Sequence, residues 1–355
     1  MGSLSMKKEK NIILCDCDAS EVESLCEGLN FSDKKFEICS HIANWKRTGK
    51  ISEMHRYGKY FAIAFKYFIK RKKYGTIIGW QQFYVLIFCF FCSILHVKKS
   101  NTLIALNFTY KEKKGKIGSI YRWFMKRCLD TGYIDYIHVP SQKYAKIINE
   151  KFQFPIDRII VLPFGINDPY EKFVTLPYPL EAPTNGYVLS IGRSNRDYDF
   201  LISAWENINY PLVIISDTYK GSNKGNANIS IIRNVAGKES YPWIAHCAAM
   251  VIPIDDGNIC SGDTVLLNSM AMKKRVVITV PSTLAEMYIV NKINGISVEK
   301  DREVFKMIML DLLFSEHYDY LQENARESFL SNYSRANMGT RLINIIDTKN
   351  NDLQN

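Results

Sequence analysis

Short apolar runs alternate with amphipathic segments along most of the 355-residue chain. Near-continuous apolar runs of strand length in the first half are NIILCDC (11–17), FEICSHI, TIIGW, TLIALNF, DYIHVPS and IIVLPFGI (159–166). Helix-like sequence follows several of them. Runs that are apolar at every position predict strands buried on both faces, as in a parallel sheet covered by helices. Residues 1–166 therefore predict an α/β domain.

The alternation breaks at NDPYEKFVTLPYPLEAPTNG (167–186), where four prolines and little periodicity predict a linker. It restarts at residue 187 with the strand-like runs YVLSIGR, PLVIISD, ISIIRNV, AMVIPID and RVVITV. Helix-like segments FLISAWENI, SYPWIAHC and TVLLNSMAM separate them. A second α/β domain is predicted, and ligands of such open sheets bind outside the carboxyl ends of the strands.

The positive charge of the chain indicates what kind of partner it could bind. The formal net charge is +10, and cationic clusters lie at 70–73 (KRKK), 111–116 (KEKKGK) and 122–127 (RWFMKR). No nucleic-acid-binding module accompanies them, which argues against nucleic acid. Aromatic residues beside each cluster, and the amphipathic pattern of 56–73, favour an anionic membrane surface. Simply solvated charge is the alternative that the sequence leaves open.

Two further features concern the membrane and the compartment. The longest apolar run, residues 84–97, is shorter than the roughly 20 residues needed to span a bilayer, so it predicts a buried helix. The opening residues MGSLSMKKEK are polar, and we expect no signal peptide. Nine cysteines without zinc spacing predict free thiols in a reducing cytosol and no metal site.

Loops of the second domain carry polar residues suited to an anionic ligand. Gly192 turns the chain after a strand, and the arginines that follow offer forked donors to phosphate oxygens. The segment SGDTVLLN opens a helix, whose first N–H groups bind phosphate well. The residues expected to bind this ligand are Gly192, Arg193, Ser194, Arg196, Asp217, Lys220, Asn234, Val235, Ser261, Gly262, Asp263, Thr264 and Asn268.

Plainer explanations exist for the same residues. The arginines would also suit an ordinary βα turn at the surface, and Thr264 can cap the helix that it precedes. Asn268 lies one turn after Thr264, where a polar side chain facing a sheet costs stability without a partner. Its side chain either meets a ligand or bonds to nearby backbone.

In this order, these segments resemble the nucleotide-sugar-binding half of GT-B glycosyltransferases, especially the large family-four group of bacterial enzymes. Gly192-Arg193 match the family's Gly-Arg, and Arg196 stands where a Lys follows. The segments LNSMA (267–271) and KRVVI (274–278) match its LEAMA helix and next strand. Both glutamates of the family's E-x7-E motif are replaced, by Cys260 and Asn268.

The resemblance implies two Rossmann-like domains facing across a cleft, the second spanning 187–335. Residues 336–355 would form a helix and tail returning toward the first domain. It also implies a nucleotide-sugar donor, most often UDP-linked, whose ribose Asn268 would hold. No metal or other cofactor is expected, because cations and helix N-termini stabilise the leaving diphosphate.

The first domain is expected to hold the acceptor. If the reaction inverts configuration, a carboxylate must deprotonate the acceptor hydroxyl, whereas a retaining reaction implies no such base. Candidate bases at strand ends are Asp16, Asp18 and Glu112. Residues expected to line the acceptor site are Trp80, Gln81, Asn107 and Tyr110.

The sequence thus predicts a glycosyltransferase that moves a sugar from a UDP-sugar to a saccharide acceptor. The basic aromatic helices favour a lipid-linked acceptor at the cytoplasmic face of the cell membrane, as in synthesis of a bacterial capsule, exopolysaccharide or lipopolysaccharide. Two alternatives stay open. Loss of both glutamates would suit a non-catalytic GT-B subunit that activates a partner transferase, and a UDP-sugar epimerase can share the fold.

Overall fold

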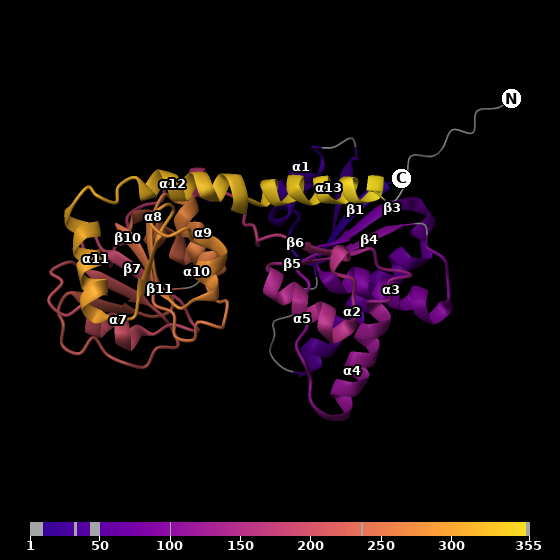
Figure 1. Cartoon of the computed structure of the whole chain (residues 1–355), viewed down its shortest axis with the longest axis horizontal. Helices are drawn as coiled ribbons and strands as arrows, with labels where there is room; N and C mark the ends of the chain where they lie inside the picture. The colour runs from indigo at the N-terminus through magenta and orange to yellow at the C-terminus, as the bar shows by residue number, and fades with distance from the viewer. Residues whose placement is uncertain (1–9, 32–33, 43–49, 100, 236, 353–355) are drawn as a thin grey trace. The chain divides into compact units, whose positions relative to one another are not determined.

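The computed structural model describes residues 10–31, 34–42, 50–99, 101–235 and 237–352 (Figure 1). The expectation about the opening residues falls on residues 1–9, outside this part of the chain. Two compact units make up the chain: residues 1–167 with 335–355, and residues 168–334.

The first unit contains a six-stranded sheet in the order β2-β1-β3-β4-β5-β6, and every paired neighbour runs parallel. Its strands are β1 (Lys10–Cys15), β2 (Phe36–Ser40), β3 (Tyr74–Gly79), β4 (Thr102–Ala105), β5 (Tyr136–Val139) and β6 (Ile159–Val161). The chain leaves β1 for β2 on one side and returns to β3 on the other. The loops after β1 and β3 therefore part at a topological switch point, where open α/β sheets bind ligands.

Helices cover both faces of this sheet. They are α1 (Glu23–Leu29), α2 (Lys50–Ile69), α3 (Gln82–Leu95), α4 (Gly115–Cys128), α5 (Gln142–Phe152) and α13 (Arg335–Asp352). The apolar run at 84–97 is the buried helix α3, as predicted. The amphipathic helix predicted at 56–73 begins earlier, at Lys50, and ends at Ile69, and a 3-10 turn follows it.

The last helix of the chain, α13, belongs to the first unit and lies along α1 (Figure 1). Met338, Leu342 and Ile346 of α13 are buried in one core cluster with Leu25 and Leu29 of α1. The two helices approach so closely that a Cβ built on Gly339 would lie 2.4 Å from the Leu25 carbonyl oxygen. This helix completes the covering of one face of the first sheet.

The second unit repeats the architecture with a sheet in the order β12-β11-β10-β7-β8-β9, again parallel throughout. Its strands are β7 (Val188–Ile191), β8 (Leu212–Ile215), β9 (Ile229–Ile232), β10 (Ala249–Ile252), β11 (Arg275–Val280) and β12 (Ile296–Glu299). Its helices are α6 (Tyr170–Phe173), α7 (Tyr198–Ala204), α8 (Tyr241–His246), α9 (Asp263–Ala271), α10 (Thr283–Tyr288), α11 (Arg302–Phe314) and α12 (Leu321–Ser328). The switch point of this sheet lies between β7 and β10.

Of residues 167–186, expected to form a linker, Asn167 is counted with the first unit, whereas 168–186 are counted with the second and hold α6. Arg326 donates both terminal nitrogens to Asp168 at 2.6 and 2.7 Å, and the rings of Phe173 and Tyr241 stack 4.0 Å apart. These contacts fasten the start of the stretch onto its own unit. Among the described helices, none is long and apolar enough to cross a membrane.

Candidate functional site

The loops after β7 and β10 are joined at the switch point of the second sheet. Asn195, after β7, donates its amide to the carbonyls of Asp256 and Ile259 at 3.0 and 3.1 Å, and its side-chain oxygen accepts from the Asp256 N–H at 2.7 Å. A backbone bridge pairs Arg196 with Ile254. The two loops therefore form one connected rim at the carboxyl edge of the sheet.

Arg196 lies between two glycines of this rim. A Cβ on Gly192 would come within 2.8 Å of Arg196 Nε, and one on Gly262 within 2.3 Å of Arg196 Nη2. The guanidinium donates from Nη1 to the carbonyls of Ser194, Asn195 and Ser261 at 3.2 to 3.3 Å. Both glycines that the sequence singled out leave room for the present position of this side chain, and Gly262 also has a φ of 114°, which other residues rarely adopt.

The charge of Arg196 has no direct counter-ion in the part of the chain that the structure describes. No carboxylate there lies within ion-pair distance of it, and its buried Nε has no hydrogen-bond partner. Burial lowers the pKa of the Arg196 guanidinium, although an arginine stays charged at neutral pH. A charge held by carbonyls alone favours an added anion, since a buried unpaired charge is costly.

Arg193 extends the cationic character to the surface. Its side chain is 72% exposed, and its Nε lies 3.7 Å from Asp217 Oδ2, which is a loose ion pair. A small cavity of about 180 Å³ lies beside Arg193, Ser194 and Arg196. A phosphate group would fit a space of this size.

The loops after β8 and β9 are tied to the same edge. Asp217 accepts the Asn234 N–H at 2.8 Å, and the Thr218 hydroxyl donates to the Arg193 carbonyl. Asp217 therefore holds the two loops together in this structure. Lys220 is exposed and makes no ion pair with another described residue, and Val235 is half-buried.

Helix α9 starts at this rim without a side-chain cap. The helix begins at Asp263, with Gly262 as the N-cap residue at φ 114°, so Asp263 and Thr264 are helical rather than part of the loop that the sequence predicted. Thr264 is the second residue of the helix and does not cap it. Because no side chain caps the helix, its first N–H groups remain available to an anion. The Ser194 and Ser261 hydroxyls lie 3.3 Å apart beside this start.

Asn268 is buried on α9. It is 6% exposed, and its side chain makes no hydrogen bond to any residue within the described ranges. The explanation by local backbone bonding is therefore wrong. Its polar atoms are not among the fully enclosed ones that lack a partner in the described residues, so the amide is open to a polar group that binds from outside the chain.

Cys260 stands at the first Glu position of the family motif. Although Cys260 is an exposed residue, partial desolvation of its thiol by the surrounding loop raises the pKa to about 12, and the Asp263 carboxylate, 3.5 Å from Sγ, acts in the same direction. The thiol is therefore neutral at physiological pH. It cannot supply the negative charge of the glutamate that it replaces.

In the first unit, Asp16 and Gln81 meet at the switch point between β1 and β3. Asp16 Oδ2 accepts from the Tyr60 hydroxyl at 2.6 Å and from Gln81 Nε2 at 3.2 Å. Gln81 also donates to the Tyr60 oxygen at 3.2 Å. Sequence analysis did not single out Tyr60. Its signal was present, since Tyr60, Ala64 and Tyr67 form the buried stripe of α2 at helical spacing.

The other two candidate carboxylates have structural partners. Asp18 caps the 3-10 turn Ala19–Glu21 by accepting from the Ser20 N–H and hydroxyl, which lowers its pKa. Glu112 pairs with Lys151 at 2.7 Å and with Arg122 at 3.1 Å, and the Lys151 contact lowers the pKa of its carboxyl. Asp16 is the one of the three that lies at the switch point between β1 and β3, so it is the best placed to act as a base.

The remaining residues expected to bind an acceptor are distributed along the same carboxyl edge. Trp80 lies under the guanidinium of Arg335, 4.8 Å from the ring centre. Asn107 donates its backbone N–H to the buried His138 ring. Tyr110 is stacked on Tyr121, and its buried hydroxyl has no partner among the residues described. Only Asp16 and Gln81 are brought into direct contact.

Metal-ligand groups do not gather in either unit. No set of three or more His, Cys, Asp or Glu side chains in the described ranges is arranged to hold a metal ion. The nine cysteines are all free thiols in the structure.

No protein-family model matches the sequence, and no curated protein matches it. Several solved structures are similar to the chain. The alignment with a glycosyltransferase from Rickettsia africae covers 97% of this chain and 97% of that protein, with a TM-score of 0.60 and 15% sequence identity. The alignment with WaaG, a glycosyltransferase involved in lipopolysaccharide biosynthesis, covers 94% of this chain and 99% of WaaG, with a TM-score of 0.58 and 12% sequence identity. The alignment with Anabaena HepE in complex with UDP covers 96% of this chain and 100% of HepE, with a TM-score of 0.59 and 11% sequence identity.

These likenesses, together with the two parallel six-stranded sheets, identify the class of the molecule by its fold. The chain has the GT-B fold, as the sequence predicted. Identities of 11 to 15% carry the comparison no further than the fold. Activity must be argued from the residues of this chain.

Proposed function

We propose that the protein is a glycosyltransferase that takes a sugar from a nucleotide diphosphate donor, a UDP-sugar, and transfers it to a saccharide acceptor. The observation that carries this proposal is the setting of Arg196. A guanidinium held by three carbonyls, without a carboxylate partner in the described chain and with its Nε unpaired, suits a diphosphate. Two glycines keep the space beside it free of side chains.

The residues around Arg196 supply the other contacts that such a donor needs. Arg193 offers a second, exposed guanidinium, and the uncapped start of α9 offers backbone N–H groups. The buried Asn268 amide can both donate to and accept from ribose hydroxyls. HepE, which shares the fold, was solved with UDP and with UDP-glucose, which supports uridine as the base of the donor.

The chemical step follows from these roles. Breaking the bond between the sugar and the diphosphate leaves negative charge on the phosphate oxygens, and cations and N–H dipoles stabilise that charge as it develops. No metal is required for this. If the transfer inverts configuration, Asp16 is the base we assign, with Tyr60 and Gln81 holding its carboxylate. A retaining transfer would not need it.

Titration with UDP and UDP-sugars tests the proposal directly. Isothermal titration calorimetry should detect UDP at micromolar to millimolar concentration, and mass spectrometry should detect donor hydrolysis or transfer. Arg193→Ala should raise the donor KM or lower kcat at least about tenfold, as expected for one lost charge-assisted contact. Lys306→Ala, on α11, serves as the matched control. Absence of UDP binding at millimolar ligand would reject the proposal.

The acceptor is proposed to be lipid-linked, at the cytoplasmic face of the cell membrane. Helix α4 exposes Ile117, Ile120 and Trp123 at helical spacing, between 49 and 70% exposed. Helix α2 exposes Phe61 and Phe65 in the same way. Rings of α3 join the two stripes: Phe90 lies 5.9 Å from Trp123 and 6.5 Å from Phe61.

Exposed cations lie on or directly beside the helices α2 and α4 that carry these apolar side chains. Exposed lysines and arginines near it are Lys66, Lys70, Lys113, Lys114, Lys116, Arg122, Lys126 and Arg127. Apolar side chains that enter the acyl boundary, with cations at the level of anionic headgroups, support binding to a lipid surface. The lipopolysaccharide role of WaaG is consistent with an acceptor of this kind, and assembly of a bacterial surface polysaccharide is the proposed setting.

Liposome sedimentation tests the membrane part separately. Binding is expected to vesicles rich in phosphatidylglycerol at low salt, and to be much weaker with neutral phosphatidylcholine or high salt. The double variant Ile120→Ala, Trp123→Ala should lose most of this binding. Ile156→Ala, which is equally exposed outside the patch, should not change it. Equal sedimentation of all three proteins would overturn the assignment.

Cys260 favours one second candidate. Because a neutral thiol replaces a charged glutamate, the chain can also be considered as a nucleotide-binding subunit that activates a partner transferase. The same titration separates the two: UDP binding with neither hydrolysis nor transfer would favour the subunit. Conversion of one UDP-sugar into another, without any acceptor, would instead identify an epimerase.

A further inference from the structure

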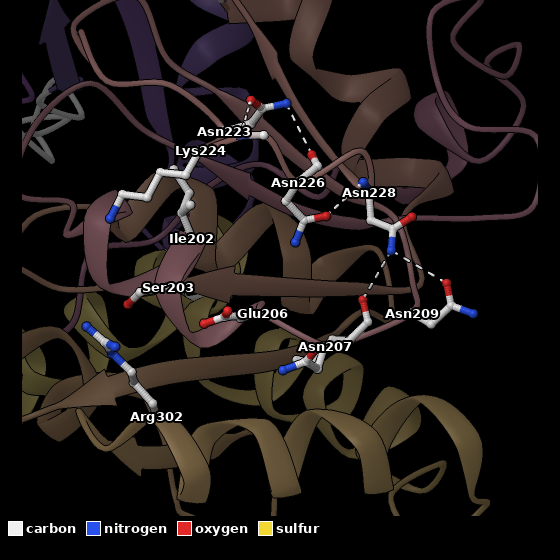
Figure 2. A pocket seen from close by; sticks show the side chains of 12 residues that line it. Ile202, Ser203, Glu206, Asn207, Asn209, Asn223, Lys224, Asn226, Asn228 and Arg302 are labelled. Atoms are coloured by element: carbon white, nitrogen blue, oxygen red, sulfur yellow. Dashed lines mark hydrogen bonds between the residues drawn. The ribbon is translucent and has the colours of Figure 1, made fainter.

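The second unit holds a larger cavity of about 680 Å³ that the proposed donor site does not use (Figure 2). It runs beside α7 and reaches the turns that precede β8 and β9. Cavities of 300 to 1,000 Å³ are typical of small-molecule sites, so this one has room for several sugar rings.

Most of the cavity wall is polar. Five asparagines line it, with Ser203, Glu206, Lys224 and Arg302, and no aromatic ring takes part. Such a wall offers little to a lipid or to a planar base, which need apolar or aromatic surfaces. Carboxamides, which both donate and accept, match the hydroxyl groups of a sugar.

Three of the asparagines build the wall and hold it rigid. Asn223 donates its amide to the carbonyls of Asn226 and Ile229 at 3.1 Å each. The Asn226 side-chain oxygen accepts the Asn228 N–H at 2.9 Å, and Asn228 donates to the Ile208 carbonyl at 3.4 Å. Ordinary turn formation explains these residues, and they carry no argument for a ligand by themselves.

Four other side chains on the wall are exposed and are not tied to it. Glu206, Asn207, Lys224 and Arg302 make no hydrogen bond or ion pair through their side chains to any residue in the described ranges, so water solvates them in the free protein and a polar ligand would replace that water. They come from the end of α7, the loop between β8 and β9, and the start of α11. Figure 2 shows Glu206 on the same side of the cavity as Lys224 and Arg302, with Asn223 beside Lys224 and with Asn209, Asn226 and Asn228 toward the other side. Three separate segments thus bring unpaired polar groups to one cavity.

We infer that this cavity binds a short saccharide that carries an acidic group. The asparagine end, with the free amide of Asn207, would take the sugar hydroxyls. Lys224 and Arg302 would take the carboxylate or other anionic substituent, since they outnumber the single carboxylate of Glu206. The inference rests on the proposed function only in that a saccharide-handling enzyme would meet such ligands.

The site is separate from the proposed donor phosphates. Arg196 lies two residues before the start of α7, whereas Glu206 and Asn207 lie beyond its end. Each site can therefore be altered without touching the residues of the other. This separation makes failure of one proposal distinguishable from failure of the other.

Saturation-transfer NMR on the full chain tests the inference, with tetragalacturonic acid and maltotetraose as probes. Tetragalacturonic acid is expected to bind at millimolar concentration, and maltotetraose more weakly. Arg302→Ala should weaken binding of the acidic probe about tenfold, and Asn207→Gly about fivefold. Glycine is chosen because Asn207 has a φ of 64°, which glycine adopts without strain. Lys306→Ala, on the same helix as Arg302, is the control.

Each possible result of these binding experiments either supports the saccharide site or overturns it. UDP binding measured on the same variants should be unchanged, whereas Arg193→Ala should impair UDP and leave the saccharide bound. Absence of binding by both probes, or binding that neither cavity variant changes, overturns the site. Equal binding of the neutral and acidic probes overturns the assignment of the acidic group. If UDP alone fails to bind, the proposed function is rejected while the cavity remains supported.

Discussion

Gly262 and Arg196 are so close that only a residue without a side chain fits beside the guanidinium. The ideal Cβ position of Gly262 lies 2.3 Å from Arg196 Nη2, and the φ of Gly262 is 114°. The first N–H groups of α9 begin at the same glycine. Gly262 thus determines both the position of the Arg196 side chain and the point where α9 begins, and we assign both features to binding of the donor phosphates.

Gly262→Ala should therefore weaken UDP binding by at least tenfold, because the new methyl group displaces Arg196. The free energy of unfolding should fall by about 1–3 kcal/mol, since an alanine at this φ is strained. Calorimetric titration and denaturant unfolding measure the two effects. Gly225→Ala is the matched control, with φ 78° and no atom within 4 Å of its Cβ position. It should lower stability alone, and a similar loss of UDP affinity in both variants would contradict the prediction.

Asp16→Asn separates the acceptor chemistry from donor binding. If Asp16 is the base, transfer should fall by about a hundredfold or more, the range of general-base catalysis, while UDP affinity stays unchanged. Asp18→Asn and Glu112→Gln should alter the rate by no more than about threefold, because their carboxylates serve a turn and two ion pairs. Full activity of Asp16→Asn would remove Asp16 as base and favour a retaining reaction.

Cys260 gives a pH-dependent prediction. Its thiol pKa is raised to about 12, mainly by partial desolvation, so the thiolate is scarce below that pH. Alkylation by iodoacetamide at pH 8 should be at least about a hundredfold slower than for a small-molecule thiol, and should accelerate as the pH rises. Asp263→Asn removes a negative charge that opposes the thiolate, so it should lower this pKa and speed the reaction. Peptide-resolved mass spectrometry follows the rate, and rapid modification of Cys260 at pH 7 would contradict the structure.

Gly339→Ala tests the packing of the last helix. A Cβ at this position meets the Leu25 carbonyl oxygen at 2.4 Å and Gly28 Cα at 3.0 Å. We expect the first unit to lose about 1–3 kcal/mol of stability, as for an overpacked contact. Hydrogen exchange read separately for the two units should show faster opening of the first alone. Gly58→Ala, inside α2 with open space around it, should instead stabilise by up to about 1 kcal/mol.

Sequence patterns predicted the two sheets well, because strands buried on both faces are apolar at every position. Val188–Ile191 and Leu212–Ile215 are buried throughout, and both were predicted. Strand β12, Ile296–Glu299, was missed because it is short and half polar, as an edge strand can be. The start of α9 was placed too late, since Gly262 rather than a side chain ends the loop.

The sequence predicted several residues of the candidate sites, but it did not predict which of them contact one another. Spacing alone showed that Asn268 faces inward, and the structure leaves its amide unpartnered in the described chain. That Arg196 would lie against Gly262 depends on β7 pairing with β10, which sequence separation conceals. Tyr60 was missed for a related reason: helical spacing predicts the buried face of α2, but not which residue on it reaches Asp16.

The placement of α13 has a consequence for biosynthesis. A ribosome releases the chain from its N-terminus onward, yet one face of the first sheet is covered only in part, by α1, until residues 335–352 emerge. The intervening 167 residues of the second unit, 168–334, can be folded by then. A nascent chain stalled before residue 335 would therefore carry a folded second unit and an incomplete first unit, whose partly uncovered apolar face is a binding surface for chaperones until translation ends.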